Sequence, residues 1–344
     1  MHDVLHDCVT DARGLGPSVP AAFAAVSSSS GARCDTPLIP SHPHPAGVSR
    51  ATLTLLTGVH AGRLVTIDAQ EVIIGRAGSS TFVVEDPGVS ERHARVARTS
   101  DGGGFYVEDL GSTNGTFVGS DRIGLSLLHG GEVVQLGPQL RMRFAMVDML
   151  EESLYRRLYE SSIHDPLTHV FNRRYLADRL VAEVARARRA KCELAVLMTD
   201  VDGMKHVNDT FGHFAGDRTL CIVGTRMKRV LRGEDILARY GGDEFMIVAP
   251  ETGRVEAVHL AERVRRAIEE LQMSTQGQHV GITLSVGVAS LAEVDATDDP
   301  DPIAALFALA DARLYGAKTA GRNRVCSVIS ESGAPPVDPQ TNRN

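Results

Sequence analysis

The apolar pattern of this chain changes near residue 147, and the change limits the folds that the chain can adopt. Before that point, short apolar runs such as EVIIG and GFYVEDL recur between turns rich in Gly, Asn, Asp and Ser. Closely spaced short strands of this kind predict an all-β sandwich. After residue 165, helical patterns alternate with apolar runs such as ELAVLMTD and EFMIVAP. Mixed helices and strands predict an α/β (α+β) domain, in which helices cover a central sheet.

We therefore divide the 344 residues into two folded domains with flanking segments. The predicted divisions are a disordered tail at 1–48, the β-sandwich at 49–146, a linker helix at 147–165, the α/β domain at 166–328 and a disordered tail at 329–344. The linker lacks Gly and Pro, and its repeated Leu150, Leu154 and Leu158 predict an amphipathic helix. A dimer-forming coiled coil would also fit, but the stretch is too short to establish one.

Composition excludes several classes of function. The net charge of −7 argues against a general nucleic-acid binder, which is usually basic. The five cysteines are scattered and form no C-x-x-C, as expected in a reducing compartment. No apolar run approaches the roughly 18 residues of a membrane span, and the first residues do not resemble a secretory signal. We therefore expect a cytoplasmic protein with neither nucleic-acid nor membrane partners.

An acidic turn is the most informative local feature. In RYGGDEFMIVAP (239–250), two glycines and two acids interrupt a strand-like run. A Gly-Gly pair suits a hairpin tip because glycine tolerates positive φ, and it lets other groups approach the backbone. If the strand that ends at Asp200 lies beside this hairpin, its carboxylate meets Asp243 and Glu244. Three such carboxylates suit Mg²⁺, and two ions could support phosphoryl-group chemistry. A plain acidic turn is the alternative.

Four motifs in one order resemble those of the GGDEF-type diguanylate cyclases. They are DPLTHVFNRRYL (165–176), DVDGMKHVNDTFGHFAGDRTL (200–220), GGDEF (241–245) and ALADARLYGAKTAGRNRV (308–325). The resemblance implies that two GTP molecules are joined into cyclic di-GMP with release of two pyrophosphates. It also implies a homodimer, because one domain would hold one GTP.

The resemblance assigns roles to individual residues. Asp243 and Glu244 would be catalytic, and together with Asp200 and the backbone carbonyl of Val201 they would hold two Mg²⁺ or Mn²⁺ ions. The residues that would bind the guanine, sugar and phosphates of GTP are Asn208, Asp217, Lys205, Gly241, Gly242, Lys318 and Arg322. An amide and a carboxylate suit the acceptor and donor edges of guanine. Asp202 is left outside the metal set as a candidate structural residue.

Two positions depart from the family pattern, and neither is a predicted ligand. Met204 stands where the family often has Phe, and His169 stands where it often has Gly or Arg. Met is a flexible apolar replacement, so we expect the phosphate loop to keep its backbone and the enzyme to be active.

An R-x-x-D sequence, Arg232 to Asp235, precedes Gly241 by a short strand-like segment. By itself this is a common charged loop. At this offset it resembles the inhibitory site of the family, where the Arg and the Asp bind cyclic di-GMP. Arg263 on the next helix is a candidate for a second arginine that holds this ligand.

Three polar loops of the β-sandwich carry its candidate site. IIGRAGSS, GVSERHARV and DLGSTNGTFV supply a cation, two hydroxyls and an amide, which suit a phosphorylated peptide. Their order resembles the forkhead-associated (FHA) domain, a phosphothreonine-binding sandwich. By that resemblance Arg76, Ser90 and Thr113 would contact phosphate and Asn114 would hold the peptide backbone. Glu91 is a departure, because an acid near a phosphate is unfavourable, and phosphate-independent docking stays open.

The expected partner of the sandwich is a phosphothreonine protein or the protein's own phosphorylated tail, in which Thr36 is followed three residues later by Ile39. The sequence therefore predicts a diguanylate cyclase that an FHA domain regulates or localises, with inhibition by its product. The alternative is a non-catalytic adaptor that binds phosphopeptide together with GTP or cyclic di-GMP.

Overall fold

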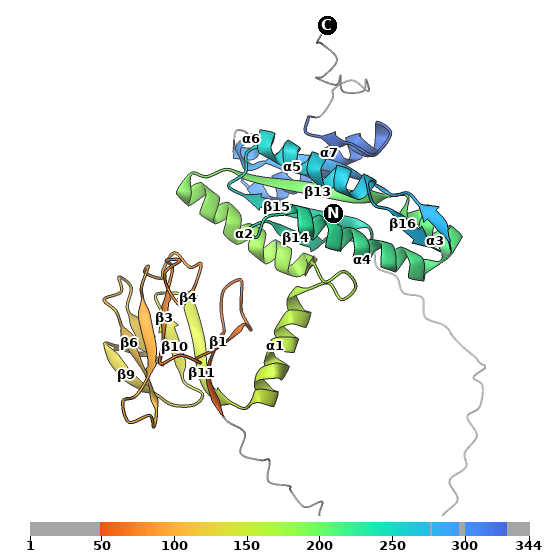
Figure 1. Cartoon of the computed structure of the whole chain (residues 1–344). Coiled ribbons are helices and arrows are strands. Elements are labelled where there is room, and N and C mark those ends of the chain that lie inside the picture. Colours follow the sequence, from red (N-terminus) through yellow and green to blue (C-terminus); the bar gives the residue numbers. More distant parts are fainter. Residues whose placement is uncertain (1–48, 276, 296–299, 329–344) are drawn as a thin grey trace, which may run out of the picture. The chain divides into compact units, whose positions relative to one another are not determined.

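A computed structural model describes residues 49–328, except residue 276 and residues 296–299 (Figure 1). The two predicted disordered tails, including Thr36, lie outside the described residues. The all-β and mixed parts follow one another along the chain and are joined by the helix α1 (Met149–Ile163).

The all-β part consists of two sheets that enclose one apolar core. The strands are β1 (Arg50–Leu55), β2 (Leu64–Thr66), β3 (Glu71–Gly75), β4 (Phe82–Val83), β5 (Ala94–Arg98), β6 (Phe105–Asp109), β7 (Thr116–Val118), β8 (Asp121–Ile123), β9 (Leu125–Leu128), β10 (Val133–Leu136) and β11 (Leu140–Val147). Their orders are β2-β1-β11-β10-β7-β8 and β4-β3-β5-β6-β9. Leu140, Met142 and Phe144 alternate with exposed arginines along β11, so one face of that strand fills the core. The predicted sandwich is confirmed.

The mixed part has one central sheet with helices on both faces. Its elements are β12 (Phe171–Asn172), α2 (Arg173–Ala190), β13 (Leu194–Asp202), α3 (Met204–Phe211), α4 (His213–Val230), β14 (Ile236–Arg239), β15 (Glu244–Pro250), α5 (Arg254–Glu269), β16 (Met273–Thr275), β17 (Gln278–Val280), β18 (Thr283–Ser290), α6 (Leu291–Asp295), α7 (Pro302–Thr319) and β19 (Val325–Cys326). The order of the central sheet is β12-β14-β15-β13-β18-β19, and β16 and β17 form a separate hairpin.

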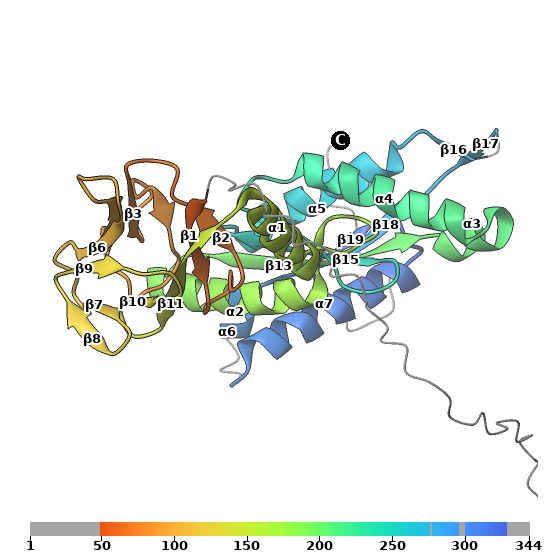
Figure 2. The same cartoon turned by 90° about the horizontal axis from the view of Figure 1, so that it is seen from below.

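Strand β13 lies in the middle of the central sheet, and all of its residues are buried. One face of the sheet, which includes Leu197 and Ile247, packs against α4 and α5. The other face, which includes Val196 and Val248, packs against α2, α6 and α7. Figure 2 shows these two helical layers on opposite sides of the sheet. The predicted sheet covered by helices is confirmed.

Residues Met149–Ile163 form the helix α1, within the stretch that the sequence predicted as helical. The Asp148 carboxylate caps its N-terminus by accepting a hydrogen bond of 2.8 Å from the backbone N–H of Glu151. Leu150, Leu154 and Leu158 are 71%, 51% and 55% exposed. The domain boundaries drawn from the sequence stay predictions.

Candidate functional site

The structure brings the predicted acidic residues to neighbouring strands. Strand β13 pairs antiparallel with β15, and Asp200 lies directly opposite Glu244. Side chains at directly opposed positions share a face of the sheet, with Cβ atoms about 5 Å apart. The Val201 N–H donates to the backbone carbonyl of Asp243 at 3.0 Å. The predicted adjacency of this strand and the acidic hairpin is therefore confirmed.

Asp200 is the most constrained of these acids. Its side chain is buried, and burial raises the pKa of the Asp200 carboxyl, with a further rise from the nearby Asp243 and a partial offset from Lys318. Lys318 Nζ, near the end of α7, donates to Asp200 Oδ2 at 2.6 Å. Across the part of the chain that the structure describes, no three His, Cys, Asp or Glu side chains are grouped as a metal site. Carboxylate and carbonyl oxygens at these strand ends are nevertheless the donors that hard divalent ions prefer.

The two glycines of the acidic turn do not use the positive φ that glycine tolerates. Neither Gly241 nor Gly242 has a positive φ. A Cβ at Gly241 would lie 2.7 Å from Glu244 Oε2, whereas a Cβ at Gly242 would meet no atom within 4 Å. Gly241 therefore makes room for the carboxylate of Glu244, and Gly242 keeps the surface of the turn open.

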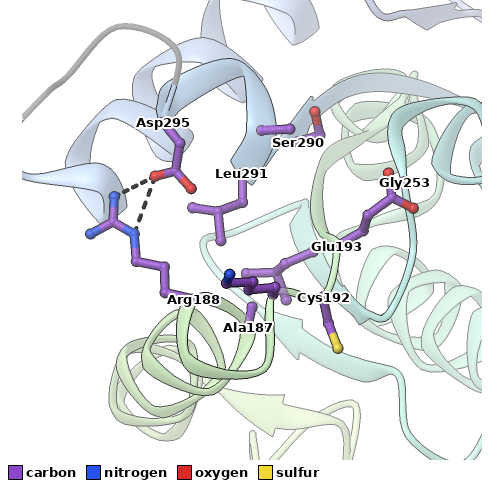
Figure 3. Close-up of a pocket in the computed structure, with 11 residues that line it drawn as sticks. Ala187, Arg188, Cys192, Glu193, Gly253, Ser290, Leu291 and Asp295 are labelled. Carbon is purple, nitrogen blue, oxygen red and sulfur yellow. Dashed lines mark hydrogen bonds and ion pairs between the residues drawn. The ribbon is translucent and has the colours of Figure 1, made fainter.

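A cavity of about 340 Å³ lies near the start of β13, away from the acidic end of that strand (Figure 3). In Figure 3, Arg188 of α2 is paired with Asp295 of α6, and Cys192 and Glu193 lie nearby. Its lining includes none of the predicted site residues.

A second cavity, of about 410 Å³, lies between α3, α4 and the acidic turn. Predicted site residues that line it are Lys205, Asn208, Asp217, Gly242 and Asp243. Of the predicted metal-binding acids, Asp243 lines this cavity together with Asn208 and Asp217, whereas Asp200 and Glu244 do not. Lys318 and Arg322 do not line this cavity. Lys318 lies in the last turn of α7, and Arg322 lies in the loop after that helix.

Several further residues line the same cavity. Met204 was noted in the sequence but was not predicted as a ligand, and the residues that sequence reasoning missed are Asp209, His213, Gly216, Leu220 and Arg239. A Cβ at Gly216 would collide with the carboxamide oxygen of Asn208. Glycine at this position therefore allows the Asn208 side chain to lie across the first turn of α4. Met204, which replaces the usual Phe, is buried in the core.

Arg239 ties two sequence motifs together and was also missed. Its guanidinium donates to the Gly242 carbonyl at 2.7 and 3.1 Å and forms an ion pair with Asp165 at 3.2 Å. Asp165 in turn accepts hydrogen bonds from the backbone and hydroxyl of Thr168. The sequence feature that could have identified Arg239 is its position directly before YGGDEF.

Asp202 has a structural environment, in line with its exclusion from the metal set. It is buried, and its carboxylate accepts hydrogen bonds of 2.8 Å from both Thr283 and Ser285. It also accepts a bond of 3.1 Å from the Asn323 backbone N–H, and Arg322 Nε lies 4.0 Å away.

The three residues predicted for product inhibition lie close together. The Arg232 N–H donates to Asp235 Oδ2 at 2.8 Å. Burial raises the pKa of Asp235, while Arg232 and Arg263 act to lower it. Arg232 and Asp235 line a cavity of about 300 Å³, to which the opening motif contributes His169 in a left-handed conformation with φ of 55°. Such a φ is one that glycine adopts without strain.

The three polar loops of the sandwich lie against one another. The backbone N–H of Arg76 donates to the Ser90 carbonyl at 2.9 Å, and the N–H of Thr113 donates to Ser90 Oγ at 3.1 Å. Asn114 donates from its side chain to the Gly88 carbonyl at 2.8 Å. Four predicted residues from three loops therefore form one polar surface.

Buried groups fix the shape of these loops. His93 Nδ1 accepts from the Ser90 N–H at 3.0 Å, so its Nε2 carries the proton donated to the Gly115 carbonyl at 3.1 Å. His93 therefore braces the loop that bears Ser90. A Cβ at Gly75 would collide with the carbonyl of Glu91. Arg122, which the sequence did not single out, packs against Gly115 beside the predicted peptide-binding loop.

Family models match both the mixed part and the sandwich. Residues 162–324 match the family model described as "Diguanylate cyclase, GGDEF domain", and residues 72–137 match that of the FHA domain. The chain is a GGDEF-domain protein that carries an FHA domain. The mixed part thus holds the GGDEF domain, and the sandwich holds the FHA domain.

Individual relatives match about half of the chain. Diguanylate cyclase DgcP of Pseudomonas aeruginosa is 38% identical over 48% of this chain and 24% of its own length. Diguanylate cyclase DosC of Escherichia coli K12 is 36% identical over 54% of this chain and 40% of its own. The crystal structure of diguanylate cyclase SiaD with its activator SiaC, from Pseudomonas aeruginosa, is 35% identical, with a TM-score of 0.47 over 52% of this chain and 66% of that one. The chain thus spans less than half the length of the two curated relatives.

Among the residues that the structure describes, no helix combines the length and the apolarity that crossing a membrane requires.

Proposed function

We propose that this protein is a diguanylate cyclase, which joins two GTP molecules into cyclic di-GMP and releases two pyrophosphates. The observation that carries the proposal is the register of β13 and β15, which sets Asp200 opposite Glu244. Asp243, which precedes Glu244, lines a cavity together with Asn208 and Asp217. Carboxylates suited to divalent ions and an amide–carboxylate pair suited to guanine thus lie next to one another.

Each group of residues has a separate task in the proposed reaction. Two Mg²⁺ or Mn²⁺ ions, held by Asp200, the Val201 carbonyl, Asp243 and Glu244, would activate the ribose 3′-hydroxyl and stabilise charge on the transferred phosphoryl group. In the guanine subsite, the Asn208 amide donates to the acceptor atoms of guanine and the Asp217 carboxylate accepts from its N–H groups. Gly241 and Gly242 leave space for the base and sugar at the turn.

Cations neutralise the phosphates in this proposal. Lys205 lies at the start of α3, and Lys318 and Arg322 lie at the end of α7 and in the loop after it. Lys318 pairs with Asp200 in this structure. We infer that Lys318 exchanges this carboxylate for a phosphate oxygen when the nucleotide is bound, since both are anionic acceptors.

Ring closure requires two nucleotides, so the proposed catalytic unit is a homodimer. The exposed leucine stripe of α1, formed by Leu150, Leu154 and Leu158, repeats every four residues. Water-exposed leucines along one helix face favour burial against a second helix. We propose that the same stripe of a second copy covers it. The proposed domain limits are those predicted from the sequence, with this helix as the linker.

The FHA domain is proposed to bind a phosphothreonine protein, or the protein's own phosphorylated tail, and so to regulate or localise the cyclase. Arg76, Ser90 and Thr113 would receive the phosphate, and Asn114 would hold the peptide backbone. We further propose that cyclic di-GMP inhibits the enzyme through Arg232, Asp235 and Arg263. A cytoplasmic location belongs to the same proposal, since GTP is an intracellular substrate.

One other function has an observation in its favour. Lys318 forms an ion pair with Asp200, a carboxylate that the proposed metal ions would need. A domain that kept this ion pair would bind nucleotide without turnover, which would make the protein an adaptor. Incubation of the purified full chain with GTP and Mg²⁺, followed by chromatography of the products, separates the two functions.

The cyclase proposal predicts that Asp243→Asn abolishes cyclic di-GMP formation. Asp311→Asn, an exposed acid on α7, is the matched control and should retain full activity. Retained activity in Asp243→Asn would contradict the assigned role, and no product from the wild type would favour the adaptor.

A further inference from the structure

The loop that follows α7 has an unfavourable backbone. Gly321, Arg322 and Asn323 have consecutive positive φ angles of 113°, 61° and 46°. Left-handed conformation costs a non-glycine residue roughly 1–2 kcal/mol, although Asn tolerates it better than most residues. Such a segment keeps its shape only if surrounding contacts hold it.

Asp202 provides one of these contacts from the central strand of the sheet. Its Oδ2 accepts from the Asn323 N–H at 3.1 Å, and Thr283 and Ser285 of β18 fix the same carboxylate from the other side. The carboxylate is buried, and hydrogen bonds to ionised groups are about twice as strong as neutral ones. The loop is therefore attached to β13 by a strong and well-oriented contact.

The side chain of Asn323 provides the second attachment. Arg265 donates to Asn323 Oδ1 at 2.7 Å, and Asn323 Nδ2 donates to Glu269 at 2.7 Å. Both partners belong to α5. Asn323 thus joins the loop to β13 through its backbone and to α5 through its amide.

Both cations of the closing motif contact strand β13 close to this attachment. Lys318 reaches Asp200, two residues before Asp202 on the same strand, and Arg322 immediately precedes Asn323. We propose that Asp202 and Asn323 are positioning residues, which hold this loop so that Lys318 and Arg322 face the triphosphate of the bound nucleotide. The inference rests on the proposed function, because it assumes that GTP occupies the site.

This arrangement separates the two ends of the nucleotide. The guanine end is read from α3 and α4, which carry Asn208 and Asp217, whereas the phosphate end depends on the loop after α7. Loss of the attachment should therefore weaken recognition of the outer phosphates and leave recognition of the base intact.

The test compares the affinities of a non-hydrolysable GTP analogue and of GMP by calorimetry. In the wild type the analogue should bind more tightly, since GMP lacks the two outer phosphates. In Asp202→Ala and Asn323→Gly, this preference should fall roughly tenfold, as expected for the loss of a charge-assisted contact, while GMP affinity stays unchanged. Because glycine tolerates positive φ, Asn323→Gly removes the Asn323 side chain without adding backbone strain. It therefore tests the positioning role even if Asp202→Ala does not fold.

Two reference variants make the outcomes distinct. Arg322→Ala should directly lower the preference for the GTP analogue over GMP. Arg188→Ala, which breaks the ion pair of Figure 3, should leave that preference unchanged. If Arg322→Ala loses the preference but Asn323→Gly keeps it, the positioning role is overturned and the proposed function stands. An equal loss of affinity for both ligands in Asn323→Gly shows a general structural role and also overturns the inference. A wild type without preference for the triphosphate contradicts the inference and the proposed function together.

Discussion

Substitution of Gly216 by Ala tests guanine recognition with the smallest possible change. A Cβ at this position collides with Asn208 Oδ1 and lies 3.0 Å from its Cγ. Because Gly216 lies in the first turn of α4 and is buried, the backbone has little room to shift. The Asn208 carboxamide must therefore move away from the position in which it would contact the base.

The expected effect is large on binding and small on stability. Loss of one hydrogen bond between the amide and guanine costs about 1.5 kcal/mol, which corresponds to roughly tenfold weaker binding. Ala in place of Gly favours the helix by up to about 1 kcal/mol, which offsets part of the steric cost. The variant should thus fold with a melting temperature near that of the wild type and bind GTP about ten times more weakly.

Gly224→Ala is the matched control, because it lies in the same helix and is also buried. A Cβ at Gly224 would meet Thr168 and Val170 at 3.4 Å, which is close to ordinary contact. Calorimetric titration of both variants with a non-hydrolysable GTP analogue measures the difference. If folded Gly216→Ala binds the analogue as tightly as the wild type, Asn208 does not read guanine and the subsite has been assigned wrongly.

Three further predictions concern other parts of the chain. Arg76→Ala should abolish binding of a phosphothreonine peptide, measured by fluorescence anisotropy; equal affinity of the wild type for the phosphorylated and plain peptide would refute the role of the FHA loops. Arg232→Ala should retain turnover but lose inhibition by added cyclic di-GMP, and unchanged inhibition would exclude this site. Burial acts to raise the pKa of Asp109, but hydrogen bonds from Ser112 and Thr116 lower it overall. Asp109 therefore stabilises the fold at pH values above its unfolded pKa of about 3.9 and loses this contribution as the pH falls through the folded value. Urea unfolding of Asp109→Asn should show the greatest deficit at neutral pH and almost none in strong acid, so a pH-independent deficit would contradict the assignment.

The parts of the fold that the sequence predicted have strong local patterns. The apolar run that forms β13 and the strands around the acidic turn made it possible to place Asp200 beside Glu244, and the register confirms this. The helical patterns expected after residue 165 are likewise present, among them α2, α5 and α7. The elements β12 and α6 and the hairpin of β16 and β17 were not predicted, because they are too short to show a period.

The parts of the site that were missed depend on packing between distant segments. The contact of Arg239 with Asp165 joins positions 74 residues apart. The need for glycine at 216 arises only when the side chain of Asn208 crosses the next helix. Of the two properties of glycine considered for the acidic turn, positive φ is not used, whereas Gly241 gives space to the Glu244 carboxylate. The spacing of residues along the sequence does not reveal such contacts between distant segments.

The central claim is that acids of two adjacent strands support divalent-ion-dependent cyclisation of GTP. It is tested most directly by the stoichiometry of the products that the purified full chain forms from GTP and Mg²⁺, with and without a chelator. We predict one cyclic di-GMP and two pyrophosphates for every two GTP consumed, and no product after chelation or in Glu244→Gln. Undiminished product after chelation, or no cyclic di-GMP from the wild type even with saturating phosphothreonine peptide, would contradict the account.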